Sequence, residues 1–120
     1  MMIAAILESG QLERLYTGLS LLVSAAADGR PARGLVSFGA LEPMLDPDLL
    51  VRAGGDGTFA RSLVELRETA RELEDCRLWA CAAAVELGGI AAADVEARLD
   101  GVMSTPRFLR EVAGAQLVVV

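Results

Sequence analysis

Lysine, histidine and asparagine do not occur anywhere in this 120-residue sequence. Without lysine the chain cannot form a Schiff base, and without histidine it lacks the most common general base and a frequent metal ligand. The only two cysteines, Cys76 and Cys81, lack the CxxC spacing of a zinc site and do not suggest a disulfide scaffold. We therefore expect no metal and no cofactor.

Positive charge is also scarce. All 11 basic residues are arginines, they are interleaved with 17 acidic residues, and the net charge is −6. Because phosphate backbones are bound by clusters of basic side chains, we expect no nucleic-acid partner. No apolar run reaches transmembrane length, and residues 1–8 lack the basic start of a signal peptide. We expect no membrane association and a cytoplasmic location.

Apolar residues, by contrast, are abundant, at 53% of the chain with a mean hydropathy of +0.43. A chain of this length suffices for one domain, which we expect to span residues 1–120. One small domain cannot easily bury this much apolar surface. Self-association is the simplest way to cover the remainder, so we expect a homo-oligomer.

The spacing of apolar residues predicts alternating strands and helices. Strands are expected at residues 3–7, 32–38, 77–80, 102–103 and 115–120. Helices are expected at residues 11–27, 59–73 and 107–112, with shorter helical segments at 41–45, after Cys81 and between 94 and 99, and a turn or strand stub at 49–52. This order predicts an α/β fold, a three-layer α/β/α domain whose mostly parallel sheet has about five strands.

Side-chain chemistry adds detail to the helices. Arg67 is assigned to the solvent side of the long helix at 59–73, together with the neighbouring charged residues. Asp94 is expected to be the N-cap of its short helix. Thr105 is expected to cap the last helix, with Pro106 at the first helical position.

Ligands of parallel sheets collect where the strands end. The candidates for contacting a substrate at these ends are Ser9, Gly10, Phe38, Gly39, Ala82, Met103 and Ser104. Cys81 is the only strong nucleophile in this set, so it is the candidate catalytic residue.

Cys81 can be interpreted in two ways. A thiol between a strand and a helix meets unpaired N–H groups and the positive end of the helix dipole, which predicts a lowered pKa and partial exposure. Alternatively, Cys81 is a small buried apolar residue, as free cysteines usually are. Cys76 lies at the other end of the strand, about 16 Å away in an extended chain, so we expect no disulfide between the two and a structural or incidental role for Cys76.

The run Cys81-Ala82-Ala83-Ala84, followed by Gly88 and preceded by a short apolar strand and a long amphipathic helix, resembles the active-site segment of the DsrE/DsrF-like sulfur-relay family. Residues 15–19, the strand that ends at Phe38-Gly39, and residues 100–109 and 114–120 follow the family's order. The resemblance does not extend to the region around residues 45–58.

This resemblance implies a DsrE-like domain that forms dimers, trimers or hexamers. It also implies that Cys81 accepts sulfane sulfur as a persulfide and passes it on, with sulfur donor and acceptor proteins or small thiols as partners. The second cysteine that some relatives carry near the C-terminus has no counterpart here. Backbone dipoles or an arginine, Arg52 or Arg107, are then left to activate the thiol.

Two other functions remain open. One is a non-catalytic oligomeric module that binds a small molecule in a strand-end pocket near Phe38, Trp79 and Met103. The other is nucleotide binding, because the run Gly54-Gly55-Asp56-Gly57-Thr58 resembles the GGDGT motif of NAD kinases and lipid kinases. Such kinases are much larger and use a further asparagine-containing motif, so this interpretation is the less favoured.

Overall fold

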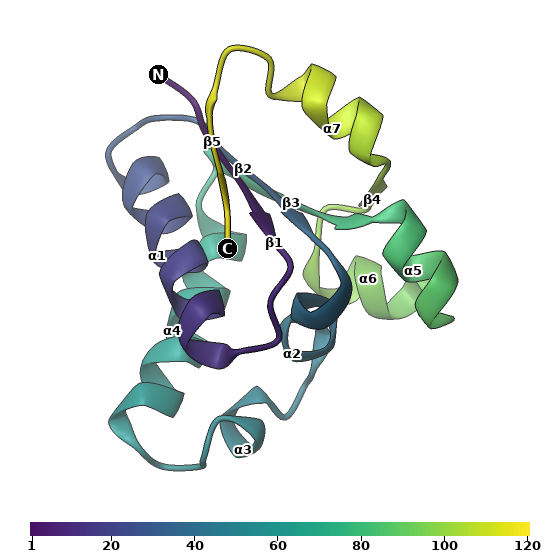
Figure 1. The fold of residues 1–120 in the computed structure, drawn as a ribbon. Coiled ribbons are helices and arrows are strands. Elements are labelled where there is room, and N and C mark those ends of the chain that lie inside the picture. Colours follow the sequence, from purple (N-terminus) through teal and green to yellow (C-terminus); the bar gives the residue numbers. More distant parts are fainter.

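Five parallel strands form the sheet at the centre of the molecule (Figure 1). The computed structural model describes all residues, 1–120. The strands are β1 (Ile3–Leu7), β2 (Ala32–Val36), β3 (Cys76–Cys81), β4 (Val102–Met103) and β5 (Gln116–Val119), and they lie in the order β4-β3-β2-β1-β5. The predicted α/β fold is confirmed, and the sheet is entirely parallel.

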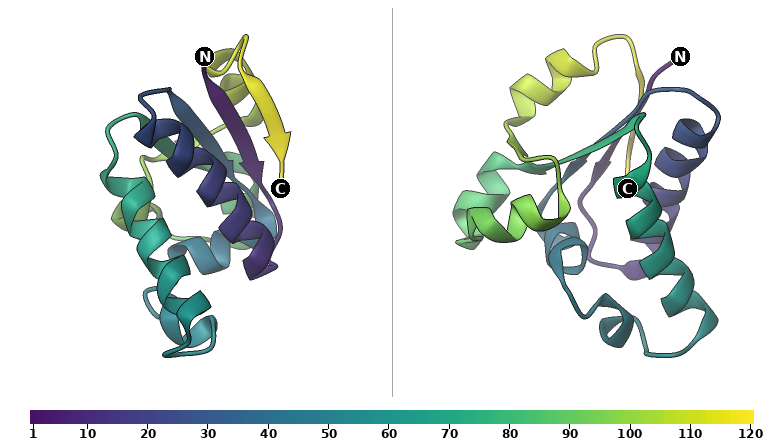
Figure 2. Two further views of the ribbon diagram at one scale, coloured as in Figure 1. Left: turned by 90° about the vertical axis from the view of Figure 1, so that its left-hand side faces the viewer. Right: turned by 180° about the vertical axis from the view of Figure 1, so that it is seen from behind.

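The two long helices, α1 (Leu12–Ala27) and α4 (Thr58–Glu72), lie side by side on one face of the sheet, as Figure 2 shows. The contacts of β2 and β3 identify this face. A Cβ atom at Gly34 would lie 2.4 Å from Leu78 Cδ2 and 3.0 Å from Leu22 Cδ1 of α1. The missing side chain at Gly34 therefore lets α1 approach the sheet closely, which explains a glycine inside a strand.

The opposite face is covered by α7 (Thr105–Glu111). Trp79 follows Leu78 in β3 and so points to the other side of the sheet. Its ring packs edge-on against Phe108 of α7, with 6.3 Å between ring centroids. Trp79 and Phe108 therefore hold α7 against the sheet.

Most of the remaining helices lie near the carboxyl ends of the strands. The remaining helices are the 3-10 turn η1 (Phe38–Ala40), α2 (Leu41–Leu45), α3 (Leu49–Arg52), α5 (Ala82–Gly88) and α6 (Ala92–Arg98). Helix α2 contacts α6, and η1 contacts α5. Helix α6 also contacts α4, where Arg98 Nη1 donates to Glu68 Oε1 at 3.2 Å. Most of these short helices thus lie near the edge of the sheet where the predicted site residues lie.

Four details differ from the sequence predictions. Strand β2 ends at Val36 rather than residue 38, because η1 begins at Phe38. Residues 49–52 form the one-turn helix α3, so the predicted turn is correct and the alternative of a strand stub is wrong. Helix α6 already begins at Ala92, which places Asp94 in its first turn rather than at the N-cap.

The fourth difference is the cap of α7. Ser104 is the N-cap, and its hydroxyl accepts a hydrogen bond from the backbone N–H of Arg107 at 3.3 Å. The prediction of Thr105 is wrong by one position. Serine and threonine cap helices in the same way, so their adjacency left the sequence signal ambiguous.

Arg67 is also misassigned by the sequence, because it is buried, with only 5% of its surface exposed. It lies on the same face of α4 as Leu63, four residues before it, and Ala70, three residues after it. The spacing of this face was visible in the sequence. The charge of Arg67, however, suggested a solvent-exposed side chain. Its hydrogen-bond partners lie in a segment distant in sequence, at the end of α2.

Strand β5 is an edge strand that pairs only with β1. Apart from the partly buried Val118, its side chains are exposed, including 57% of Val119. No proline or charged residue lies within the strand to protect its free edge, as natural edge strands usually require. None of the helices is long and apolar enough to cross a membrane.

Candidate functional site

The predicted site residues lie at one edge of the sheet, where the parallel strands end. Cys81 is the last residue of β3, and Met103 is the last residue of β4 and pairs with it. Ser9 and Gly10 follow β1, and Phe38 and Gly39 form η1 after β2. Ala82 opens α5 and Ser104 caps α7. The structure therefore brings the predicted site residues to one edge of the sheet, and their role in binding or catalysis stays a prediction.

Cys81 is at once the end of β3 and the N-cap of α5. Burial raises the pKa of its thiol, but hydrogen bonds oppose this effect and lower the pKa overall. The groups that lower the pKa are the backbone N–H of Ala84, the hydroxyls of Ser37 and Thr105, and the backbone N–H of Ala83. The Cys81 Sγ atom lies 3.9 Å from Thr105 Oγ1. The predicted lowering of the pKa agrees with this geometry.

The predicted partial exposure of Cys81 is wrong, because only 4% of the residue is exposed. It is still part of β3, so β4 flanks it, while α5 and α7 begin beside it. The thiol is thus a buried group with its own hydrogen-bond donors. Ser37, which is itself buried, was missed because the sequence placed it inside a strand.

Cys76 lies at the other end of β3 and is also buried. Burial and the nearby Asp100 carboxylate raise the pKa of its thiol to about 11, although Arg33 opposes this effect. Both cysteines are free. The two thiols therefore differ in chemistry: Cys76 stays protonated at neutral pH, whereas the surroundings of Cys81 favour the thiolate.

Gly10 and Gly39 bring the ends of β1 and β2 together. A Cβ atom at Gly39 would lie 2.8 Å from the backbone N of Gly10 and 3.0 Å from the carbonyl oxygen of Glu8. Such distances are not tolerated, so Gly39 is required by backbone packing. Next to it, Phe38 has a φ of 37°, which is unusual for a bulky residue, and its side chain is largely exposed.

A cleft of about 820 Å³ opens beside this edge, between η1 and α2 on one side and α5 and α6 on the other. It is lined by Phe38, Leu41, Glu42, Leu45, Asp46, Pro47, Arg52, Ala84, Leu87, Gly88, Gly89, Ile90, Ala91 and Asp94. The predicted pocket near Phe38, Trp79 and Met103 is therefore only partly correct. Trp79 packs against Phe108, and Met103 belongs to the hydrophobic core.

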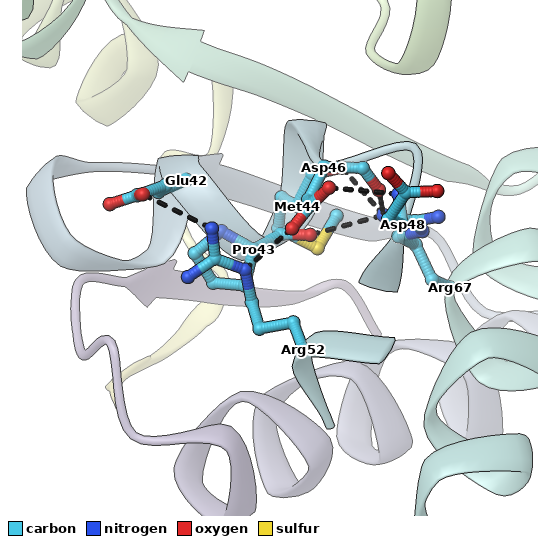
Figure 3. A network of polar contacts seen from close by, with 7 residues as sticks. All are labelled: Glu42, Pro43, Met44, Asp46, Asp48, Arg52 and Arg67. Carbon is cyan, nitrogen blue, oxygen red and sulfur yellow. Dashed lines mark hydrogen bonds and ion pairs between the residues drawn. The ribbon is translucent and has the colours of Figure 1, made fainter. Parts of the chain in front are cut away.

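Arg52 is fixed at the wall of the cleft by two carboxylates (Figure 3). Its Nε donates to Asp46 Oδ2 at 2.6 Å, and its Nη2 donates to Glu42 Oε1 at 3.1 Å. Hydrogen bonds from Arg52 and from the backbone N–H of Asp48 lower the pKa of Asp46. Neither Arg52 nor Arg107 is among the groups that lower the pKa of Cys81, so the predicted activation by an arginine has no support in this geometry.

Arg67 of α4 contacts the C-terminal end of α2 (Figure 3). Its Nη1 donates to the carbonyl oxygens of Pro43 at 3.0 Å, Met44 at 3.3 Å and Asp46 at 2.7 Å. These carbonyls end helix α2, and of the three only that of Pro43 also accepts a backbone hydrogen bond, from the N–H of Asp46 at 3.4 Å. A cation at a helix C-terminus is also favoured by the helix dipole. Arg67 thus positions one wall of the cleft.

The Gly54–Thr58 run connects α3 to α4, with φ values of 110° at Gly54 and 87° at Gly55. Neither of the two cavities in the structure is lined by this loop. Nucleotide binding there stays a prediction that rests on the sequence motif alone.

No family model matches this sequence, and no curated protein matches it. A solved structure does match: the crystal structure of YchN from E. coli has a TM-score of 0.67, with 14% sequence identity over 99% of this chain and 98% of that chain. YchN has a DsrE-like fold, and the all-parallel sheet flanked by helices agrees with it. At this identity the likeness shows the fold alone.

Proposed function

We propose that this protein is a sulfur carrier that accepts sulfane sulfur as a persulfide on Cys81 and passes it to a partner. The observation that carries the proposal is the lowered pKa of the Cys81 thiol at the carboxyl edge of the sheet. The thiolate is the nucleophile in sulfur exchange, so a lowered pKa increases the reactive fraction at neutral pH. The DsrE-like fold and the resemblance around Cys81 support the same assignment.

The reaction consists of two balanced exchanges. In loading, the Cys81 thiolate attacks the outer sulfur of a donor persulfide R–S–SH, so that Cys81–S–SH forms and R–S⁻ leaves. In handover, an acceptor thiolate attacks the outer sulfur of Cys81–S–SH, a new S–S bond forms on the acceptor, and Cys81 leaves as a thiolate. Neither exchange requires an oxidant or a reductant. The donor and acceptor are proteins or small thiols.

The protein's own polar groups stabilise the Cys81 thiolate, although the chain has no histidine or lysine to act as a base. Because the chain has neither histidine nor lysine, the Cys81 proton is lost to solvent rather than to a side-chain base. The N–H groups of Ala83 and Ala84 and the hydroxyls of Ser37 and Thr105 then stabilise the sulfur anion. The same donors stabilise Cys81 when it leaves as a thiolate in handover.

Access to the thiol requires a local movement, because Cys81 is only 4% exposed. We assign this movement to η1, whose Phe38 combines a left-handed φ with a side chain that is 59% exposed. Strained backbone of this kind is typical of segments that change conformation.

The proposal is tested by sulfur loading. The folded protein is incubated with a polysulfide, and peptides containing Cys81 and Cys76 are analysed by mass spectrometry for an added sulfur atom. We expect the added sulfur on Cys81 and not on Cys76. The matched variants are Cys81→Ser, which should lose the added sulfur, and Cys76→Ser, which should retain it.

Two results would contradict the persulfide proposal. One is sulfur uptake by Cys81→Ser equal to that of the original protein. The other is a Cys81 thiol that resists alkylation in the folded protein at every pH at which the fold persists, since such a thiol could not take part in exchange.

A second candidate is a binding module of the same fold without thiol chemistry, which the burial of Cys81 favours. It predicts no sulfur loading, together with ligand binding that survives Cys81→Ser. Nucleotide binding through Gly54–Thr58 is the third candidate. ATP binding that is lost in Asp56→Ala would support it.

A further inference from the structure

We propose that the cleft between α2 and the α5–α6 pair binds an extended segment of another protein, in which apolar side chains lie next to lysine or arginine. The apolar part of this proposal comes from the walls of the cleft, and the basic part comes from its charge. The cleft is built from one continuous stretch after β2 and one after β3, so both walls lie at the functional edge of the sheet.

The walls offer apolar surface that the folded chain itself leaves uncovered. Leu87 of α5 is 77% exposed and Phe38 of η1 is 59% exposed, while Leu41 and Ala84 are buried beneath them. Large apolar side chains at the rim of a concave site mark an interaction surface. Because its rim residues are this exposed, the cleft is open to solvent and suits the side chains of an extended segment better than an enclosed small ligand.

The charge of the cleft selects cations. Glu42, Asp46 and Asp94 line it, and Arg52 is the only basic residue there. Arg52 is already paired with Glu42 and Asp46, whereas Asp94 takes part in none of the ion pairs of the chain. The lining therefore carries two uncompensated negative charges in a protein whose net charge is −6. A lysine or arginine is attracted, and an anionic segment is repelled.

The aromatic ring at the rim adds a second preference for a cation. The exposed ring of Phe38 offers a face on which an ammonium or guanidinium group can lie. The aliphatic stems of lysine and arginine also cover apolar walls while their charged ends reach carboxylates at the rim.

The cleft adjoins the candidate nucleophile. Ala84 lines the cleft, and its backbone N–H is one of the groups that lower the pKa of Cys81. Phe38, which also lines the cleft, directly follows Ser37, whose hydroxyl lowers the pKa of the same thiol. A bound segment would thus lie beside Cys81, and we assign it to the sulfur-exchange partner. That role rests on the proposed persulfide function, whereas the docking itself does not.

The test compares two labelled peptides, one of alternating leucine and lysine and one with glutamate in place of each lysine. Fluorescence anisotropy measures their binding to the full chain at low and physiological salt. We expect the lysine peptide to bind at least about tenfold more tightly than the glutamate peptide, with a difference that shrinks as salt rises.

Variants locate the binding site. Asp94→Lys should weaken binding of the lysine peptide about tenfold, whereas Glu96→Lys, which changes the same charge on the exposed side of the same helix, should have little effect. Leu87→Ser should weaken binding, whereas Val51→Ser should not. Val51 is 74% exposed but lies outside the cleft.

Equal binding of the two peptides would overturn the proposal, and so would equal losses in the Asp94 and Glu96 variants, because both results indicate general attraction to an acidic protein. Peptide binding and sulfur loading are measured separately on the same protein. Loading without peptide binding overturns the docking site, and peptide binding without loading overturns only the persulfide function.

Discussion

The position of Arg67 leads to a quantitative prediction about α2 and the cleft wall. In Arg67→Ala, the carbonyls of Pro43, Met44 and Asp46 lose the Nη1 donor that they share. The hydrogen bonds to Pro43 and Met44 are buried, whereas the one to Asp46 is only partly buried. The Pro43 carbonyl keeps the hydrogen bond from the backbone N–H of Asp46, whereas the buried Met44 carbonyl is left without a partner, which costs about 1–3 kcal/mol.

One effect reduces this cost. Burial, with a smaller effect of the nearby Arg98, lowers the pKa of Arg67, which means that its charged form is itself destabilised in the folded protein. Removing the guanidinium relieves that penalty, and water can reach part of the space it leaves. We therefore expect Arg67→Ala to lower the free energy of unfolding by about 1–2 kcal/mol, in the lower part of that range.

The assay is urea unfolding followed by the fluorescence of the single tryptophan, Trp79, which packs between the sheet and α7. At a slope of about 2 kcal/mol per molar urea, the expected loss lowers the unfolding midpoint by about 0.5–1 M. Arg61→Ala, an exposed arginine of the same helix, should change stability by no more than about 0.5 kcal/mol.

Hydrogen exchange separates the local effect from the global one. If Arg67 acts as the structure indicates, amides of α2 lose protection in Arg67→Ala more than amides of α1 do. A loss of stability no larger than that of Arg61→Ala would refute the reasoning. Unchanged relative protection of α2 would also refute it, because some other contact would then hold the cleft wall.

Three further predictions follow from the thiols and the edge strand. Iodoacetamide should modify Cys81 below pH 9 while Cys76 stays protected, and Ser37→Ala should shift the pH profile of Cys81 alkylation upward because a donor to the thiolate is lost. The pKa of Cys76 is about 11 in the folded protein against 9.0 for an ordinary thiol, so its ionisation favours unfolding. Stability should fall by about 2 kcal/mol as pH rises from 9 to 11, and Cys76→Ala should remove this fall in pH-dependent unfolding. Finally, we expect the chain to self-associate through the free edge of β5: light scattering should show smaller particles for Val119→Lys but not for Val51→Lys.

The sequence predicted those parts of the fold that depend on local pattern. The spacing of leucines in α1 and α4 and the short apolar runs of the strands specify element type, and their alternation selects a parallel sheet. The errors fall where two segments distant in sequence meet. Arg67 was assigned to solvent because its partners, the carbonyls at the end of α2, lie more than twenty residues earlier in the chain.

In the candidate site, too, the sequence predicts the features that depend on local pattern and misses those that depend on contacts between distant segments. Cys81 and the other strand ends could be found because a parallel sheet gathers its carboxyl ends at one edge. The cleft could not be predicted from the sequence, because its two walls come together only when α2 packs against α6. The hydroxyl of Ser37 was missed for a related reason: it approaches Cys81 across the β2–β3 pairing, and nothing in the local sequence marks it as a donor.

The chemistry assigned to Cys81 depends on its exact position in the chain, at the junction between β3 and α5. Ala80, the preceding residue, pairs with Val36 and, by the alternation of a strand, points to the face covered by α1, where it is fully buried. Ala82, the following residue, already lies inside α5. Only position 81 ends the strand and also lies within reach of the unpaired N–H groups of the helix. A thiol moved to either neighbouring position would lose these donors, so Cys81→Ala with Ala80→Cys or Ala82→Cys should not restore sulfur loading.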